Sequence, residues 1–211
     1  MSEVKKSKRG RPVGSRNARN ETRAQLIRAG VELLTEKGFT STGLEEILRK
    51  VNVPKGSFYY YFDSKEQFGA ALIESYGAYF GAKLDLFFLD EDVSPLQRLV
   101  NFVGHARHNM ARFDFNRGCL IANLGQEMSV LPGTFRQQLI DVFNDWQART
   151  AKCFKAAQEA GEIDTTFDSD ELAAQFWIGW EGAVLRAKLE RQAFPMDIFF
   201  RGFMKSLNSK V

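Results

Sequence analysis

The stretch VPKGSFYYYFDSKE, residues 53–66, contains five consecutive aromatic side chains, from Phe58 to Phe62. Successive residues of an α-helix point about 100° apart, so five rings in a row cannot all enter one hydrophobic core. Phe58 and Phe62 are four residues apart and share one helical face. We therefore expect these two phenylalanines to be buried and the three tyrosines between them to face outward.

The segments before this stretch predict two further helices. Apolar residues recur at helical spacing over residues 21–37, and Gly38 supplies a C-terminal stop. Thr42 and Glu45 have the spacing of a capping box, in which each side chain satisfies a backbone N–H of the first helical turn, so a second helix is expected to begin there. A turn follows, and then a third, very short helix over residues 55–62.

The remainder of the chain also predicts helices, because no segment alternates between apolar and polar residues over the length of a strand. Ser64 and Gln67 repeat the capping-box spacing, several prolines suit first-turn positions, and Asp168 or Ser169 can cap a late helix. The later helices are expected over residues 64–89, 95–113, 132–160, 169–191 and 195–208. The predicted fold class is all-α, with an N-terminal three-helix helix-turn-helix domain followed by a larger helical domain.

Composition limits the class of protein. The chain has 211 residues, of which 44% are apolar and 26% charged, as in globular proteins. No apolar run approaches the roughly 18 to 20 residues of a membrane span, and the basic N-terminus has no apolar segment behind it as a secretory signal would. Two cysteines are too few for a disulfide-framed secreted fold. We expect a cytoplasmic protein without membrane contact.

Two short helices joined by a tight turn, with a helix before them, form a helix-turn-helix, whose second helix enters the major groove of DNA. A phenol suits such a surface because its ring packs while its hydroxyl donates to phosphate. Gly56 allows the helix to approach the bases, and Ser57 can bond a base edge or a phosphate. Lys55 and Lys65 lie at the starts of successive helices, where phosphates bind well.

Residues 38–68, GFTSTGLEEILRKVNVPKGSFYYYFDSKEQF, resemble the N-terminal domain of the TetR family of transcriptional repressors almost position for position, within a likeness that covers about residues 21–70. The resemblance implies an all-helical homodimer that binds double-stranded operator DNA and is released by a small-molecule effector. The DNA contacts that it implies are Thr42, Lys55, Gly56, Ser57, Tyr59, Tyr60, Tyr61 and Lys65. Three parts are then expected: a disordered basic arm (1–20), a DNA-binding domain (21–68) and a ligand-binding and dimerisation domain (69–211).

The N-terminus has an excess of positive charge that the rest of the chain does not share. Residues 1–28 contain nine Lys or Arg and two Glu, whereas the whole chain has a net charge of only +3. The sequence KRGRP at residues 8–12 resembles the core of an AT-hook, whose arginines lie in the narrow minor groove of A·T-rich DNA. Arg9 and Arg11 are therefore candidate DNA contacts, although a basic run can also be a solubilising tail.

Two late helices are candidates for a dimer interface. The helix over residues 169–191 has two neighbouring apolar stripes, so one can pack inside the subunit and the other can meet a symmetry mate. The first stripe comprises Leu172, Phe176, Gly179 and Ala183, and the second Trp177, Trp180 and Val184. The helix over 195–208, with Ile198, Phe199, Phe203 and Leu207, would complete a four-helix interface.

Residues 117–129, RGCLIANLGQEMS, resemble a branch of the TetR family whose repressors respond to acrylate or to electrophiles. The shared pattern is a Gly-Cys-Leu, an Asn-Leu or Lys-Leu element and a Glu. By that resemblance the effector is a small reactive or unsaturated metabolite such as acrylate, held between helices of the C-terminal domain.

Cys119 has two interpretations. Arg117 and the helix start expected beside it would favour the thiolate that attacks electrophiles, and alternatively the side chain is a small buried hydrophobe. Cys153 fits a structural role. For a carboxylate effector the candidate partners are Arg117, Asn123 and Arg186, with Trp146, Trp177 and Trp180 as walls. Glu181 would be costly to bury unpaired, so it is on the surface, paired with Arg186, or a ligand-orienting group.

Two other classes of function compete with a ligand-responsive repressor. A Cys119-dependent enzyme lacks any recognisable catalytic signature, and His105 and His108 have no third metal ligand at a suitable spacing, so we expect them on an exposed helix face. A ligand-independent architectural DNA-binding protein would not need the large aromatic C-terminal domain. The sequence therefore predicts a DNA-binding repressor that is not an enzyme and has no cofactor.

Overall fold

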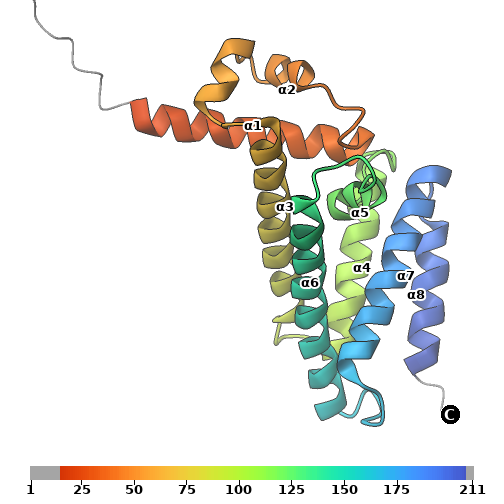
Figure 1. Ribbon diagram of the computed structural model, residues 1–211. Helices are drawn as coiled ribbons and strands as arrows, with labels where there is room; N and C mark the ends of the chain where they lie inside the picture. Colours follow the sequence, from red (N-terminus) through yellow and green to blue (C-terminus); the bar gives the residue numbers. More distant parts are fainter. Residues whose placement is uncertain (1–14, 208–211) are drawn as a thin grey trace, which may run out of the picture.

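The computed structural model describes residues 15–207, and every regular element in that range is helical, as the sequence predicted. The α-helices are α1 (Ser15–Lys37), α2 (Leu44–Lys50), α3 (Lys65–Phe88), α4 (Pro95–Arg112), α5 (Leu120–Gln126), α6 (Thr134–Glu159), α7 (Ser169–Glu190) and α8 (Phe194–Leu207), and a 3-10 helix, η1 (Lys55–Tyr60), follows α2. Figure 1 shows α1 lying across one end of a bundle of long helices, with α2 on its far side and α5 at the junction. Arg9 and Arg11 lie outside the described residues.

The helix-turn-helix domain is built around the two phenylalanines that the aromatic run contributes. Phe58 and Phe62 are 0% and 1% exposed, so the prediction that they are buried is confirmed. Both rings contact Phe68 of α3, with centroids 5.6 Å and 4.7 Å apart. The short helix is thereby locked to the first turns of α3, which continues into the bundle.

The expected capping box at Thr42 is not formed. Helix α2 begins at Leu44 after Gly43, which provides no side-chain cap. The hydroxyl of Thr42 instead donates to the carbonyl of Gly38 at 2.6 Å, and Glu45 pairs with Lys55. The hydroxyl is thus directed back toward the end of α1 and does not cap the first turn of α2.

The other predicted helix starts agree better with the structure. Ser64 caps α3, because its hydroxyl accepts from the N–H of Gln67 at 3.0 Å. The side chain of Asp168 accepts from two N–H groups at the start of α7. The expected start of the first helix was too late, since α1 begins at Ser15 and includes residues that were assigned to the basic arm.

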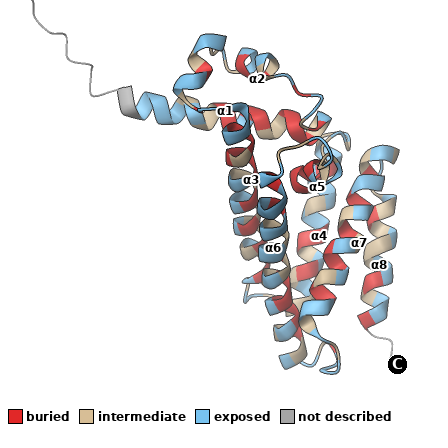
Figure 2. Cartoon of the chain, in the orientation of Figure 1, coloured by how far each residue is buried: buried red, intermediate tan, exposed pale blue. Residues whose placement is uncertain are grey.

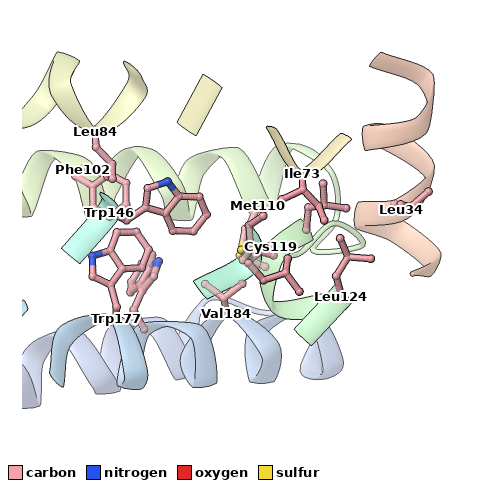
Figure 3. Close-up of a cluster of buried hydrophobic side chains, with 14 of the residues drawn as sticks. Leu34, Ile73, Leu84, Phe102, Met110, Cys119, Leu124, Trp146, Trp177 and Val184 are labelled. Carbon is pink, nitrogen blue, oxygen red and sulfur yellow. The ribbon is translucent and has the colours of Figure 1, made fainter. Parts of the chain in front are cut away.

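Helices α3, α4, α6 and α7 enclose the core of the bundle, and Figure 2 shows the buried residues on their facing sides. A Cβ on Gly77 of α3 would lie 2.8 Å from Cγ2 of Val142 on α6, so a glycine allows these helices to approach closely. The centre is aromatic, as Figure 3 shows: the rings of Trp146 and Trp177 lie 5.1 Å apart, and the indole N–H of Trp177 donates to Thr150 at 2.9 Å. No helix among residues 15–207 is long and apolar enough to cross a membrane.

Helix α8 packs against α7 within the same subunit, which corrects part of the expected dimer interface. Phe203 and Leu207 are buried in the protomer. A Cβ on Gly179 would overlap the ring of Phe199, so the stripe that contains Gly179 faces α8 of the same subunit. The tryptophan stripe is buried as well, because Trp177 and Trp180 belong to the central core.

Candidate functional site

The helix-turn-helix presents an aromatic and polar surface. The side chain of Tyr59 is 66% exposed, Tyr60 is also exposed and Tyr61 is half-buried. Sequence analysis missed Arg19 of α1, whose guanidinium lies 4.4 Å from the centroid of the Tyr60 ring and donates to the Tyr60 carbonyl at 2.8 Å. The first helix therefore adds a cation to the surface that η1 forms, and the only signal of this in the sequence was the basic run before residue 28.

The other candidate DNA contacts on this surface are accessible. A Cβ on Gly56 would meet open space, and Ser57 is half-buried. Lys55 is exposed and its ammonium lies 2.6 Å from Glu45, whose hydrogen bond raises the pKa of Lys55. Lys65 is exposed at the first turn of α3.

Thr42 differs from the other candidate contacts. It is 2% exposed, and its hydroxyl is occupied by the carbonyl of Gly38. Its side chain therefore organises the loop between α1 and α2 and does not form part of the outer surface.

A cavity of about 590 Å³ lies between α1, α3, α4 and α7 and reaches the loop before α5. Its walls are largely apolar, and Figure 3 shows that Cys119, Met110 and Val184 approach one another from different elements. The apolar lining includes Phe80, Phe102, Met110, Trp180 and Val184. Four of the predicted ligand residues, Arg117, Cys119, Trp180 and Glu181, also line this space.

The cavity contains a cluster of three polar groups that belong to different elements: Tyr76 of α3, Cys119 before α5 and Glu181 of α7. Burial raises the pKa of Glu181 to about 7, against a weaker opposing effect of a hydrogen bond with Cys119. Burial, reinforced by Glu181, raises the pKa of the Cys119 thiol well above its usual range, and the pKa of Tyr76 is also well above its usual value. The Oε2 atom of Glu181 is buried without a hydrogen-bond partner among the described residues.

Arg117 does not activate the thiol of Cys119. Its guanidinium pairs with Glu32 and with Glu36, both on α1, and lies 4.0 Å from the centroid of the Phe113 ring. Cys119 is the N-cap residue of α5, so the expected helix start is confirmed, yet it is 9% exposed and its thiol is held in the protonated form by burial. The geometry therefore favours the interpretation of Cys119 as a buried wall residue over that of a thiolate.

Several predicted ligand residues lie outside the cavity. Trp146 and Trp177 belong to the aromatic core. Asn123 donates to the carbonyls of Leu34 and Thr35 at the end of α1. Arg186 is exposed and pairs with Glu190 four residues later, and so it does not neutralise Glu181.

The lining of the cavity includes cationic side chains. Arg28, Lys83 and Arg112 line the cavity and form no ion pair with any carboxylate of residues 15–207. The Nζ atom of Lys83 lies 3.1 Å from Nε2 of His105, whose pKa is lowered by burial and then by Lys83.

His105 and His108 are exposed on α4 as expected, and the described residues contain no group of three or more side chains that could hold a metal ion. Sequence analysis missed Arg28, Tyr76 and Lys83 because they are far from residues 117–129 in the chain.

Comparison with known proteins identifies the family to which this architecture belongs. Residues 26–72 match the family described as bacterial regulatory proteins of the tetR family, and residues 95–203 match the tetracyclin repressor-like C-terminal domain. The chain is 54% identical over 198 residues to the transcriptional regulator AcuR of Cereibacter sphaeroides, which covers 94% of this chain and 90% of the relative. It is 27% identical over 183 residues to the HTH-type transcriptional repressor NemR of Escherichia coli strain K12, covering 87% and 92%.

Solved structures agree with these sequence relationships. The crystal structure of regulatory protein TetR from Rhodobacter sphaeroides has a TM-score of 0.85 at 54% identity, and covers 87% of this chain and 97% of that one. The reduced form of E. coli NemR has a TM-score of 0.79 at 27% identity, covering 89% and 97%. The chain therefore belongs to the TetR family of transcriptional repressors, in a branch with AcuR and, more distantly, NemR.

Proposed function

We propose that this protein binds operator DNA in the cytoplasm as a homodimer and is released by a small molecule that occupies the cavity. The observation that supports this most directly is the dual role of α1. The helix packs in the DNA-binding domain, and it also lines the cavity with Ile27, Val31 and Thr35. A ligand that prefers a different position of α1 would shift the population toward dimers whose recognition helices are wrongly spaced for DNA.

The DNA-binding surface in this proposal is the exposed side of η1 with the start of α3. Phenol and hydroxyl groups would bond phosphates and base edges, and the lysines would exchange their protein partners for phosphate. The proposed contacts are Arg19, Lys55, Gly56, Ser57, Tyr59, Tyr60, Tyr61 and Lys65, with Arg9 and Arg11 in the adjacent minor groove.

The homodimer would use an exposed apolar stripe on α7 and its continuation on α8. Ile178, Leu185 and Leu189 are exposed, and they follow one another at intervals of seven and four residues, which keeps them on one side of the helix. Phe194 and Ile198 of α8 are exposed as well. On α7 this stripe differs from both stripes expected from the sequence, whereas Ile198 of α8 was among the residues expected at the interface. The aromatic core stays intact within each subunit.

The effector we propose is a small organic acid, with acrylate as the first candidate from the resemblance of residues 117–129. The cations that line the cavity without an ion pair would attract an anion, and the apolar walls suit a short carbon chain. Burial raises the pKa of Glu181 to about 7, and in its protonated form the carboxyl group can donate a hydrogen bond to an oxygen of the ligand. Because the pKa of Cys119 is raised, reversible binding is better supported than covalent capture.

The test begins with selection of bound duplexes from a random DNA library, followed by titration of the selected operator with sodium acrylate, sodium propionate and N-ethylmaleimide. We expect one dimer per operator and release by acrylate, both in the wild type and in Cys119→Ser. Failure to select any sequence, or a monomer in sedimentation, would contradict the operator proposal. Loss of the acrylate response in Cys119→Ser would support covalent sensing instead.

A further inference from the structure

Glu127, at the C-terminal end of α5, holds the loop that leads into the helix-turn-helix. Its Oε1 atom accepts from the backbone N–H of Phe39 at 2.9 Å, and Oε2 accepts from the N–H of Thr40 at 2.7 Å. The Thr40 hydroxyl also donates to Oε2. A single carboxylate thus satisfies two consecutive amides of a loop that lies 87 and 88 residues away in sequence, and hydrogen bonds to a charged acceptor are stronger than neutral ones.

The turn before these amides has the shape that the carboxylate requires. Gly38 has a φ of +83°, a left-handed conformation that glycine adopts without strain. A Cβ at this position would overlap Oε1 of Glu127. The carbonyl of Gly38 then accepts from Thr42 at 2.6 Å, so the anchored turn continues through hydrogen bonds to the start of α2.

The opposite end of α5 lies at the cavity. Cys119, its N-cap residue, lines the cavity together with Gly118, and the N–H of Gly118 donates to the carbonyl of Thr35 at 3.1 Å. Lys188 of α7 donates to the carbonyls of Thr35 and Glu36 at 2.9 Å each. The last turn of α1 is therefore held by donors from the C-terminal domain, including Asn123. Helix α5 extends from the cavity wall at Cys119 to the loop at Phe39.

We propose that Glu127 is a positioning residue that couples the cavity to the DNA-binding domain: it fixes the loop at Phe39 and Thr40 in the geometry that binds operator, and it transmits displacement of α5 to that loop. Glu127 does not touch DNA in this scheme. The inference rests on the proposed function, because it needs an operator, but it does not depend on the identity of the effector.

Reciprocal linkage gives a test without the effector. If the loop and the cavity wall are coupled, operator binding must change the accessibility of Cys119 as well. The experiment uses full-length protein with Cys153→Ser, so that Cys119 is the one remaining thiol, and measures its rate of alkylation by N-ethylmaleimide with and without saturating selected operator. We expect operator to change this rate several-fold when residue 127 is Glu, and to have no effect in Glu127→Gln.

Operator affinity and amide exchange complete the test. Glu127→Gln has nearly the same shape but replaces one acceptor by an NH₂ group, so we expect roughly tenfold weaker operator binding and faster hydrogen exchange at Phe39 and Thr40. Glu74→Gln makes the same chemical change on the exposed face of α3 and should alter neither. If Glu127→Gln folds poorly, Thr40→Val removes only the hydroxyl donor and should show a smaller loss in the same direction.

The outcomes separate the two proposals. If the wild type selects no operator, the proposed function fails. If the wild type binds operator but Cys119 alkylation does not respond to it, or responds equally in Glu127→Gln, the coupling role is wrong. Operator affinity in Glu127→Gln equal to that of the wild type would likewise overturn the positioning role.

Discussion

Cys119 and Glu181 interact with each other in the lining of the cavity, and burial raises the pKa of both side chains. The thiol and the carboxyl group come from elements about 60 residues apart, so only the fold brings them together. Each group in its charged form would disfavour ionisation of the other, because like charges at short range repel. At neutral pH the pair therefore holds more protons than two independent, solvated groups would, because Glu181 with a pKa of about 7 is partly protonated where a solvated glutamate is ionised.

The first prediction concerns the reactivity of Cys119. Because the thiolate is the reactive form and its formation is suppressed, we expect Cys119 to react with N-ethylmaleimide at pH 7 at least tenfold more slowly than a free cysteine. Glu181→Gln removes the neighbouring charge and should accelerate the reaction at pH 8. The rate is measured by mass spectrometry in Cys153→Ser protein. A rate equal to that of free cysteine would show that the thiol is not protected by the fold.

The second prediction concerns the pH dependence of stability. The folded pKa of Glu181 is about 7, above its ordinary value of 4.5, so between these values the folded protein binds more protons than the unfolded chain. The contribution of Glu181 to the free energy of unfolding is therefore lost as pH rises from 4.5 to 7, by about 3 kcal/mol, and is constant above that range. Glutamine stays neutral, so Glu181→Gln should be more stable than the wild type at pH 8.

Urea unfolding at pH 5 and pH 8 measures this difference directly. At pH 5 the two proteins should have similar midpoints, and at pH 8 the variant should have the higher one. Glu74→Gln, on an exposed face, provides the matched control and should follow the wild type at both values. Parallel pH profiles for Glu181→Gln and the wild type would mean that Glu181 is ionised in the folded protein at neutral pH.

The third prediction separates the two kinds of aromatic residue in the run from Phe58 to Phe62. Phe58→Ala removes a fully buried ring and should cost about 3–5 kcal/mol of stability. Tyr60→Phe removes only a hydroxyl from an exposed ring, so its melting temperature should stay within about 1 °C of the wild type. We expect operator affinity to fall several-fold in Tyr60→Phe, measured by fluorescence anisotropy. Unchanged affinity would remove the Tyr60 hydroxyl from the proposed contacts.

The contrast between these aromatic residues also shows what the sequence could reveal. Helical spacing separates Phe58 and Phe62 from the tyrosines because burial on one face is a local, periodic property. The capping function of Asp168 is equally local. By contrast, the hydroxyl of Thr42 could serve either the helix after it or the carbonyl before it, and only the path of the chain at Gly38 decides between them.

The cavity could be predicted only in part for the same reason. The family resemblance of residues 117–129 led to Arg117 and Cys119, which do line it. Tyr76 and Lys83 come from α3, and no short pattern connects them with α5. The role of Glu127 depends on two backbone amides, which carry no signature in the sequence at all.

The fourth prediction concerns the basic arm. The double variant Arg9→Ala, Arg11→Ala should weaken operator binding, because two cations that displace counterions from DNA are lost. Each lost phosphate contact reduces the slope of log affinity against log salt by about 0.9, so the two substitutions together should reduce it by roughly 2. Binding is measured by anisotropy between about 50 and 200 mM salt, the range over which this electrostatic contribution changes most.

Replacing Lys152 and Lys155, which lie on α6 in the bundle, removes the same charge at a distance from the helix-turn-helix and is the matched control. If both double variants reduce the slope equally, the arm acts only through net charge. If only the arm variant reduces the slope, and A·T-rich flanks of the operator increase the difference in affinity between that variant and the wild type, the arginines bind in the minor groove.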